Sequence, residues 1–322
     1  MSSPTVLVIA SPSAPHLKVL ERLPPDIRMI VSNDPSQLRQ AAPEADVMLL
    51  GDFESPGFLS DVFPHATRLR WLHSISAGVE SFLPVIAASP VPLTNGRGMF
   101  RVPLAEWAVG AMLFFAYNLR RLIQQQEEGR WERVYHQGLA GHSLGIVGYG
   151  EIGAAIAQRA RPFGLKISAL RRKPELSLDD PLLDATYRPE QLHEMFAASD
   201  YVALATPLTP STRGMIGPAE FAAMKPSAVL VNVGRGPVID EPALIDALES
   251  GRIRGAALDV FATEPLPTGH PFYRMKNLLL SPHSADHTPG FKERALEIFV
   301  ENFERFRKGE PLHNLVDKHA GY

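Results

Sequence analysis

Short apolar runs alternate with stretches of helical character along almost the whole chain, and each run has Pro, Gly, Asp or Ser near an end. Runs of this length predict β-strands, and their alternation with helices predicts βαβ units and mostly parallel sheets. The first series of predicted strands is Thr5–Ala10, Arg28–Ser32, Val47–Gly51, Leu69–Ser74 and Val91–Asn95. The second series is Leu144–Gly148, Lys166–Leu170, Tyr201–Ala205, Ala228–Val233, Ala256–Val260 and Leu278–Ser281. The pattern therefore predicts an α/β fold in which the six later strands form one complete doubly wound sheet.

A different pattern separates the two series. From Arg101 to Gly129 the chain is rich in Ala, Leu, Met and Phe and then in Glu, Gln and Arg, with no proline after Pro103. This predicts one helix of about 25 residues. Because its first turns are apolar nearly all round, the helix must be buried between domains or subunits. A last helix is predicted over Phe291–Lys308, where apolar residues recur at helical spacing.

Composition narrows the class of protein. The 322 residues suggest about two domains. The net charge of −3 comes without any block of like charge, so no nucleic-acid partner is expected. The absence of cysteine excludes disulfides, thiolate zinc sites and cysteine nucleophiles. The N-terminus lacks a basic signal-peptide region, and the longest apolar stretch, Ala108–Tyr117, is shorter than the roughly 20 residues that span a bilayer. We therefore expect a soluble, cytoplasmic protein with no membrane partner.

The sharpest local motif is G-x-G-x-x-G at 148–153, between a predicted strand and a predicted helix. In a dinucleotide-binding turn the first glycine permits the tight turn, the second lets the backbone approach a pyrophosphate, and the third lets the helix pack on the strand. The helix N-terminus adds amide donors and the positive end of its dipole. The alternative is a strand–helix turn without a ligand. The predicted cofactor contacts are Gly148, Gly150, Glu151, Ile152 and Gly153.

The next predicted strand ends in Arg171 and Arg172, with no carboxylate before Glu175. An NAD site places Asp or Glu near this point to hold the ribose 2′-hydroxyl, whereas a guanidinium matches a phosphate. We predict that both arginines bind the 2′-phosphate of NADP(H), which is then the preferred cofactor ahead of NAD(H). The alternative is a solvated basic turn.

Three further segments, Asn232–Gly236, Asp259–Pro265 and Ser281–Ala285, follow consecutive predicted strands. Open α/β sheets bind their ligands at this edge, so the three together favour a functional site, although each alone has a structural explanation. A competing motif, G-x-S-x-G at 141–145, matches a serine-hydrolase elbow. However, Ser143 leads into a strand, whereas that nucleophile must follow one.

Taken in order, these motifs resemble the D-isomer-specific 2-hydroxyacid dehydrogenases, and the resemblance covers essentially the whole chain. It includes Ser76–Glu80, Ala105-Glu106 and Thr206–Gly214 as well. The resemblance implies a catalytic triad of Arg235, Glu264 and His283, and a substrate site of Ala77, Gly78 and Arg235. The cofactor contacts that it adds are Thr206, Pro207, Thr212, Val233, Asp259, His283 and Ala285.

The resemblance also implies a discontinuous architecture. Residues 1–97 and 288–322 would form a flavodoxin-like substrate domain. Residues 98–287 would form a Rossmann NADP(H)-binding domain inserted into it, with hinges near Gly96–Gly98 and Ala285–Pro289. Enzymes of this kind are typically homodimers, which would place the apolar helix region 101–129 at the dimer contact.

The implied reaction is the NADPH-dependent reduction of a small 2-keto acid of the glyoxylate or hydroxypyruvate type to the D-2-hydroxy acid. His283 suits a general acid because an ordinary histidine pKa of about 6.5 is close to working pH. Glu264 would orient the imidazole, and Arg235 would clamp the substrate carboxylate and keto oxygen. Backbone amides of Ala77 and Gly78 would hold the carboxylate from the other domain.

Two other functions fit the same motifs. One is a dinucleotide-sensing protein related to corepressors of this fold. The other is a D-3-phosphoglycerate dehydrogenase-like enzyme, although many of these carry a C-terminal regulatory domain, for which nothing remains after His319. His287 lies four residues after His283, a spacing that suits a metal on a helix. Pro282 and Pro289 argue against a helix there, so we expect no metal and place His287 at a cleft edge or an interface.

Overall fold

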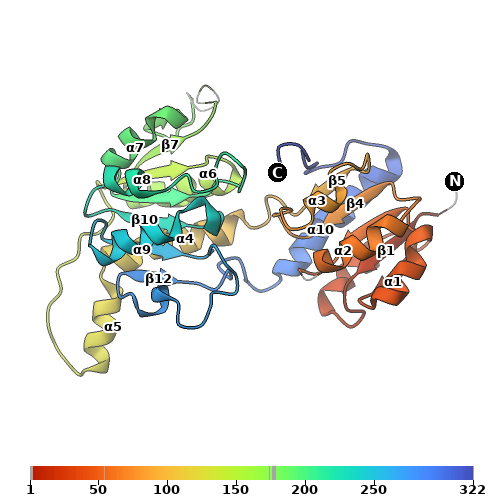
Figure 1. Ribbon diagram of the computed structural model, residues 1–322, viewed down its shortest axis with the longest axis horizontal. Coiled ribbons are helices and arrows are strands. Elements are labelled where there is room, and N and C mark those ends of the chain that lie inside the picture. The colour runs from red at the N-terminus through yellow and green to blue at the C-terminus, as the bar shows by residue number, and fades with distance from the viewer. Residues whose placement is uncertain (1–2, 54, 174, 176–178, 322) are drawn as a thin grey trace. The chain divides into compact units, whose positions relative to one another are not determined.

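The computed structural model describes residues 3–53, 55–173, 175 and 179–321, and it divides the chain into two compact units. Unit 1 consists of Met1–Phe100 and Thr288–Tyr322, and unit 2 of Arg101–His287 (Figure 1). The first division therefore comes three residues after the predicted boundary at 97/98, and the second comes at the predicted one.

Unit 1 is built on a parallel sheet with the order β2-β1-β3-β4-β5. This is the flavodoxin-like order, as predicted. The strands of unit 1 are β1 Thr5–Ile9, β2 Arg28–Ser32, β3 Val47–Leu50, β4 Trp71–Ser74 and β5 Leu93–Asn95. Its helices are α1 Pro35–Ala41, α2 Leu59–Val62, α3 Leu83–Ile86 and α10 Phe291–Lys308.

The two faces of this sheet carry separate apolar cores, because successive side chains of a strand point to opposite faces. Leu7 and Ile9 of β1 pack with residues of α1, α2 and α3. Val6 and Val8 pack instead with α10, including Phe299. The C-terminal helix thus completes a unit that the first hundred residues begin, which is why unit 1 is discontinuous along the chain.

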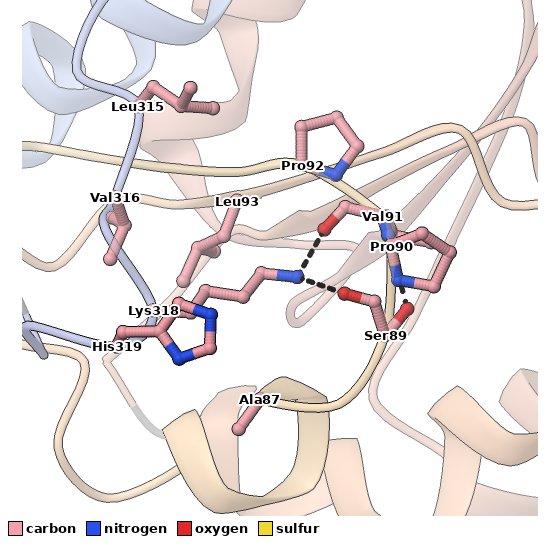
Figure 2. A pocket seen from close by; sticks show the side chains of 10 residues that line it. All are labelled: Ala87, Ser89, Pro90, Val91, Pro92, Leu93, Leu315, Val316, Lys318 and His319. Carbon is pink, nitrogen blue, oxygen red and sulfur yellow. Dashed lines mark hydrogen bonds between the residues drawn. The ribbon is translucent and has the colours of Figure 1, made fainter.

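The C-terminal tail is fastened beside β5. The amide of Val316 donates to the carbonyl of Leu93 at 2.8 Å. Lys318 lines a pocket at this point and donates from Nζ to the carbonyl oxygens of Ser89 and Val91 at 2.7 and 2.6 Å (Figure 2). It also donates to the carbonyl oxygen of Ile86 at 3.3 Å. Three acceptors satisfy the three N–H groups of an ammonium, so this pocket is part of the tail's anchorage.

Unit 2 is built on a seven-stranded parallel sheet with the order β12-β11-β10-β9-β6-β7-β8. The strands are β6 Ser143–Val147, β7 Lys166–Leu170, β8 Ala185–Tyr187, β9 Tyr201–Leu204, β10 Val229–Asn232, β11 Gly255–Leu258 and β12 Leu278–Leu280. The chain reverses its direction across the sheet between β6 and β9, which is the switch point of a Rossmann fold. The prediction of six strands was one short, because β8 is a three-residue edge strand with no buried residue.

The helices of unit 2 cover both faces of this sheet. They are α4 Arg101–Ala116, α5 Leu119–Glu127, α6 Glu151–Ala160, α7 Leu192–Ala198, α8 Pro218–Ala223 and α9 Glu241–Glu249. Helix α4 packs on α6 and on β10 and β11, whereas α7, α8 and α9 share a core with the other face. Strands and helices alternate as the apolar pattern predicted, so the α/β class with two doubly wound parallel sheets is confirmed.

The single helix predicted over 101–129 was wrong. The chain forms α4 and α5, which meet at a bend of 64°. Asn118 adopts a left-handed conformation, with φ of 49°, and Arg254 donates to its Oδ1 at 2.9 Å as well as to the carbonyl of Phe115. Asparagine tolerates this conformation, and the arginine satisfies a carbonyl that ends the first helix. Within the described part of the chain no single helix is long and apolar enough to cross a membrane, and α4 and α5 meet that test only as a bent pair.

His73 of β4 gives unit 1 an expected sensitivity to acid. Its side chain is fully buried, Nδ1 lies 2.7 Å from Oγ1 of Thr94, and Nε2 has no described partner. Burial lowers the pKa of His73 from 6.5 to about 3. Between these two pH values the unfolded chain binds a proton that the folded chain does not, so the free energy of unfolding decreases by up to about 1.4 kcal/mol for each unit by which the pH is lowered.

We expect His73→Leu to reduce this dependence, measured by urea unfolding at about pH 7 and about pH 5. Equal losses of stability in wild type and variant over this interval would contradict the assignment.

Candidate active site

The predicted site residues of unit 2 follow the carboxyl ends of six neighbouring strands. The glycine motif follows β6, Arg171 follows β7, and Thr206 comes two residues after β9. Arg235, Glu264 and His283 come after β10, β11 and β12. Because all strands run parallel, these segments lie at one edge of the sheet, on either side of the switch point.

The glycine loop has the geometry that its sequence predicts. Gly148 has a φ of 92°, and a Cβ there would lie 2.9 Å from the backbone of Ala205. A Cβ on Gly153 would lie 2.4 Å from the carbonyl oxygen of Gly148, so this close approach of helix and strand requires glycine. Gly150 precedes the first turn of α6, and nothing lies within 4 Å of a Cβ built there. Open space is therefore found where a ligand would approach the helix N-terminus, beside the exposed Glu151 and the half-buried Ile152.

Arg171 lies beside this loop. The amide of Gly148 donates to the carbonyl of Leu170 at 3.2 Å, so the end of β7 is adjacent to the glycine turn. The guanidinium carbon of Arg171 lies 5.8 Å from the ring centre of Tyr149, whose hydroxyl donates to Asp180 at 2.9 Å. Burial and the bond to Asp180 raise the pKa of Tyr149, so it stays a neutral platform under the cation. Arg172, the next residue, is exposed.

Arg235 is carried by a loop with little freedom. Asn232 is wholly buried; its Nδ2 donates to the carbonyl of Arg235 at 3.1 Å, and its Oδ1 accepts from the amide of Gly234 at 3.0 Å. A Cβ on Gly234 would lie 2.8 Å from the carbonyl oxygen of Thr206, and one on Gly236 would lie 1.9 Å from the carbonyl carbon of Phe261. The loop is thus wedged between its two neighbours, which orients the arginine.

His283 and Glu264, far apart in the sequence, form a hydrogen-bonded pair. Nδ1 of His283 lies 2.6 Å from Oε2 of Glu264, and the two side chains are 47% and 35% exposed. The other carboxylate oxygen, Oε1, accepts from the amide of Phe261 at 2.9 Å. His283 has a φ of 51°, a left-handed conformation that histidine tolerates better than most side chains. Because the carboxylate holds Nδ1, Nε2 is the ring nitrogen left to face a reactant.

The charges around this pair favour the imidazolium. The bond to Glu264 raises the pKa of His283 above its usual value, and it outweighs burial and the positive charge of Arg235, which lower it. Burial raises the pKa of Glu264, but the bonds from His283 and Phe261 outweigh it, so this carboxyl is held below its usual pKa. The positive charge of Arg235 lowers the pKa of both groups, so Arg235 acts on the pair through its charge.

Asp259 organises the turn that carries the histidine. Its Oδ1 accepts from Ser281 Oγ at 2.6 Å and from the amides of Ser284 and Ala285 at 2.9 and 3.0 Å, and its backbone carbonyl accepts from the amide of His283 at 2.8 Å. The buried carboxylate therefore supports the 281–285 turn, and the Ala285 amide is used within the protein. Direct cofactor contacts by Asp259 and Ala285 stay predictions.

The segment after β9 lies between the glycine loop and the arginine loop. Thr206 contributes backbone to the close approach of Gly234, and Oγ1 of Thr212 donates to the carbonyl of Pro207 at 2.7 Å. Val233 is buried, and its amide donates to the carbonyl of Leu204 at 3.1 Å. These residues lie in the middle of the series of loops at the carboxyl ends of the strands. Their predicted contacts with a cofactor would be made mainly by backbone atoms.

The loop Ser76–Gly78 of unit 1 follows β4. The amide of Gly96 donates to the carbonyl of Ser76 at 3.1 Å, and Nδ2 of Asn95 donates to the carbonyl of Ala77 at 2.7 Å. Within the described ranges the amides of Ala77 and Gly78 themselves donate to no protein acceptor. Two adjacent amides are therefore available to an anion in unit 1.

Comparisons with known proteins decide the family. A model of the D-isomer specific 2-hydroxyacid dehydrogenase NAD-binding domain matches residues 109–285. The chain is 34% identical over 269 residues to a glyoxylate reductase of Korarchaeum cryptofilum, a match that covers 80% of this chain and 79% of the relative. The chain belongs to the D-isomer specific 2-hydroxyacid dehydrogenase family. It is an NAD(P)-dependent oxidoreductase.

Two other relatives of this dehydrogenase bear on its substrate and cofactor. A D-3-phosphoglycerate dehydrogenase of Methanocaldococcus jannaschii is 30% identical over 309 residues, which are 94% of this chain and 57% of the relative. The structure of an NADPH-dependent glyoxylate/hydroxypyruvate reductase from Sinorhizobium meliloti, in complex with NADP and sulfate, superposes with a TM-score of 0.84. That match has 27% identity and covers 99% of this chain and 100% of the other.

The residues of this dehydrogenase fit a dinucleotide. The open space at Gly150 and the ten-residue helix α6 behind it suit the pyrophosphate of a dinucleotide, and among the described residues no side chain caps the helix. In the part of the chain that the structure describes, no three His, Asp or Glu side chains gather as a metal site requires. Nδ1 of His287 lies 2.9 Å from Oδ1 of its neighbour Asp286.

Sequence reasoning assigned no role to Asn232, although this residue holds the Arg235 loop. The available signal was a polar side chain at the end of an apolar strand that is buried on both sides. Ser143, the rejected hydrolase nucleophile, is the first residue of β6 and donates to the carbonyl of Ala198, so it lies at the end of the strand opposite to the site.

Proposed function

We propose that this dehydrogenase reduces a small 2-keto acid of the glyoxylate or hydroxypyruvate type with NADPH, giving the D-2-hydroxy acid. The observation that carries the proposal is the 2.6 Å contact between His283 Nδ1 and Glu264 Oε2, with the positive charge of Arg235 acting on both groups. A dinucleotide sensor has no need of a proton donor backed by a carboxylate and flanked by a guanidinium. The similarity to glyoxylate reductases supports the same substrate class.

The chemistry of the protein's own residues follows from this geometry. When bound, NADPH supplies the hydride that reduces C2 of the keto acid. Negative charge then develops on the keto oxygen, and the Nε2–H of protonated His283 neutralises it by donating a proton. Glu264 stabilises the imidazolium and fixes its orientation through Nδ1. Arg235 binds the carboxylate and the keto oxygen, which orients the substrate and stabilises the developing charge.

The substrate carboxylate has a second candidate donor set in unit 1. The proposal assigns it to the amides of Ala77 and Gly78, which have no acceptor among the described residues. Asn95 holds the loop that carries them by donating to the carbonyl of Ala77. Two backbone donors recognise a carboxylate without selecting the rest of the acid, which suits an enzyme for a small substrate.

NADP(H) is the proposed cofactor because Arg171 follows β7 beside the glycine turn, over the ring of Tyr149. This is where a dinucleotide site distinguishes a 2′-hydroxyl from a 2′-phosphate. The pyrophosphate would lie at Gly150 and the N-terminus of α6, and the nicotinamide end would extend toward the β10, β11 and β12 side of the sheet. The NADP complex of the Sinorhizobium meliloti reductase supports the assignment.

The test is an assay of initial rates with glyoxylate, hydroxypyruvate and larger 2-keto acids, each with NADPH and with NADH. We expect the highest kcat/KM for one of the two small acids with NADPH. Tight NADPH binding without turnover of any acid would favour the sensor. A higher kcat/KM for the oxidation of 3-phosphoglycerate than for the reduction of either small acid would favour a phosphoglycerate dehydrogenase. The Methanocaldococcus jannaschii relative supports that alternative.

The pH dependence of the reduction should report His283. Because its pKa is raised, the protonated acid persists to higher pH than it would in an ordinary histidine. We expect the kcat/KM for reduction to fall above an apparent pKa higher than about 6.5, and Glu264→Gln to move that fall to lower pH. An unchanged alkaline limb in Glu264→Gln would show that another group is the acid.

The proposal includes a homodimer. Helix α5 and the extended segment after it project from the rest of unit 2 (Figure 1). Trp131 and Tyr135 of this segment are 99% and 95% exposed, and Ile123 of α5 is also exposed. Asn118 Nδ2 donates to the carbonyl of Tyr135, so the segment is held to the helix and is not a free tail. Aromatic side chains gathered on one projecting element mark an association surface, and a second copy of this chain is the proposed occupant.

A cytoplasmic location remains a prediction from the sequence.

We expect Trp131→Ala combined with Tyr135→Ala to convert a dimer into a monomer, because aromatic anchors carry much of an interface's free energy. Size-exclusion chromatography with light scattering measures the change. Phe163→Ala, an exposed aromatic position outside this segment, is the control and should stay dimeric. A monomeric wild type, or a variant that stays dimeric, would contradict the proposed surface.

A further inference from the structure

A second histidine–glutamate pair lies behind the loop that carries Glu264. Nε2 of His270 lies 3.1 Å from Oε1 of Glu241, and the two side chains are 17% and 18% exposed. The amide of Phe272 donates to Nδ1 of His270 at 3.4 Å. Since Nδ1 accepts, the ring hydrogen is on Nε2, and His270 donates to the carboxylate of Glu241.

The other carboxylate oxygen of Glu241 binds the loop that carries Glu264. Oε2 accepts from the amide of Ala262 at 3.1 Å, and Ala262 lies two residues before Glu264. The preceding amide, that of Phe261, donates to Glu264 itself at 2.9 Å. Two consecutive amides of one loop are therefore bound by two carboxylates. Glu264 folds back on its own loop, and Glu241 holds the same loop from the start of α9.

The loop is confined on its other sides as well. A Cβ on Gly236 would lie 1.9 Å from the carbonyl carbon of Phe261, so the backbone that follows Arg235 is already in contact with it. The ring of Phe272 lies 6.2 Å from that of Phe261 and 4.7 Å from that of His270. The His270–Glu241 pair and the loop that carries Glu264 are therefore in continuous contact. A change in the pair can shift Glu264 through these contacts.

We propose that Glu241 and His270 are positioning residues that set the place of the Glu264 carboxylate, and through it the orientation and protonation of His283. The inference rests on the proposed function, in which His283 donates the proton. His270 orients Glu241, Glu241 binds the Ala262 amide, and that bond determines where the loop presents Glu264. A displacement of about 1 Å at the acid can reduce turnover about 10²-fold.

The test uses Glu241→Ala and His270→Phe in the full chain. We expect kcat to fall about 10- to 100-fold in Glu241→Ala while the Kd of NADPH changes less than about 2-fold, because the glycine loop and Arg171 lie at other strand ends. We also expect the His283 ring to titrate at lower pH by NMR, since the bond from Glu264 raises its pKa. Glu241→Gln keeps one acceptor oxygen for Ala262 and should recover part of both effects.

The matched control is Glu220→Ala. Glu220 also binds one histidine, with His193 Nε2 at 2.9 Å, and one backbone amide, that of Gly217 at 2.9 Å, but it lies at the start of α8. We expect this variant to keep the kcat and the His283 titration of the wild type. If Glu241→Ala and His270→Phe behave as Glu220→Ala does, the proposal is wrong. A fall in kcat with an unshifted His283 titration would likewise assign the pair a purely structural role.

The NMR titration separates this inference from the proposed function because it requires no turnover. A wild type that reduces no 2-keto acid would contradict the proposed function. A shifted His283 titration in the same protein, with Glu241 or His270 replaced, would still support the coupling through the loop. Should Glu241→Ala fail to fold, Glu241→Gln and His270→Phe can be measured in the same two assays. Each change alters one residue of the pair and leaves the other residue in place.

Discussion

Replacement of His283 by asparagine should lower kcat for reduction about 10²- to 10⁴-fold, the usual contribution of a general acid. Asparagine tolerates the left-handed φ of 51° found at this position, so the turn should survive the change. It cannot donate a proton to an alkoxide as an imidazolium does. NADPH binding should be retained, because the glycine turn and Arg171 follow other strands of the sheet, β6 and β7. Steady-state rates and a fluorescence titration of NADPH measure the two properties separately.

The control for this experiment is His193→Asn. His193 also forms a pair with a glutamate, with Nε2 2.9 Å from Oε1 of Glu220, but it is exposed on α7. Its replacement should leave kcat within about 2-fold of the wild type, as expected for a surface pair. A His283→Asn enzyme that retains wild-type kcat would remove the proton-donor role and the mechanism built on it.

Replacement of Arg171 by aspartate together with Arg172 by serine should shift the cofactor preference toward NADH. A charged hydrogen bond contributes about 1.5–3 kcal/mol, so the loss of two phosphate contacts should lower kcat/KM with NADPH about 10²-fold or more. The new carboxylate would also repel a 2′-phosphate, whereas it can accept from the 2′-hydroxyl of NADH. The ratio of kcat/KM for the two cofactors, with one keto acid, measures the change.

Lys173→Ser serves as the matched control because it removes a positive charge from the same turn. Lys173 is exposed and has no assigned contact, so the cofactor ratio should change by no more than a few-fold. If the double arginine variant leaves the ratio as it is in the wild type, the 2′-phosphate site must be sought elsewhere. A ratio that falls equally in Lys173→Ser would indicate general electrostatic attraction and no specific clamp.

Much of the fold could be read from the sequence. Most strands of both sheets are buried on both faces, although the edge strands β2 and β8 are not, so most of them stand out as apolar runs. G-x-G-x-x-G marks the switch point by itself. The loops of Arg235, Glu264 and His283 were found because each directly follows such a run. Parallel strands bring those loops to one edge, so their proximity followed from the fold class.

Two features were missed, and they have different causes. The break between α4 and α5 rests on Arg254, which holds the carbonyl of Phe115 and the side chain of Asn118 across the fold. Helix propensity and spacing carry no record of such a contact. The strand β8 escaped prediction because its three residues have no buried position and pair with β7 at the edge of the sheet.

The sequence by itself determined the α/β class, the dinucleotide turn and the residue types of the site, because these depend on local spacing and on steric limits at glycine. Tertiary structure alone decided that Glu264 meets Nδ1 of His283, that Asp259 supports the turn beneath it, and that Glu241 and His270 hold the loop beside it. The reason is physical: hydrogen bonds require positions within a few tenths of an ångström. The packing of loops from separate strands sets such positions, and no sequence interval specifies them.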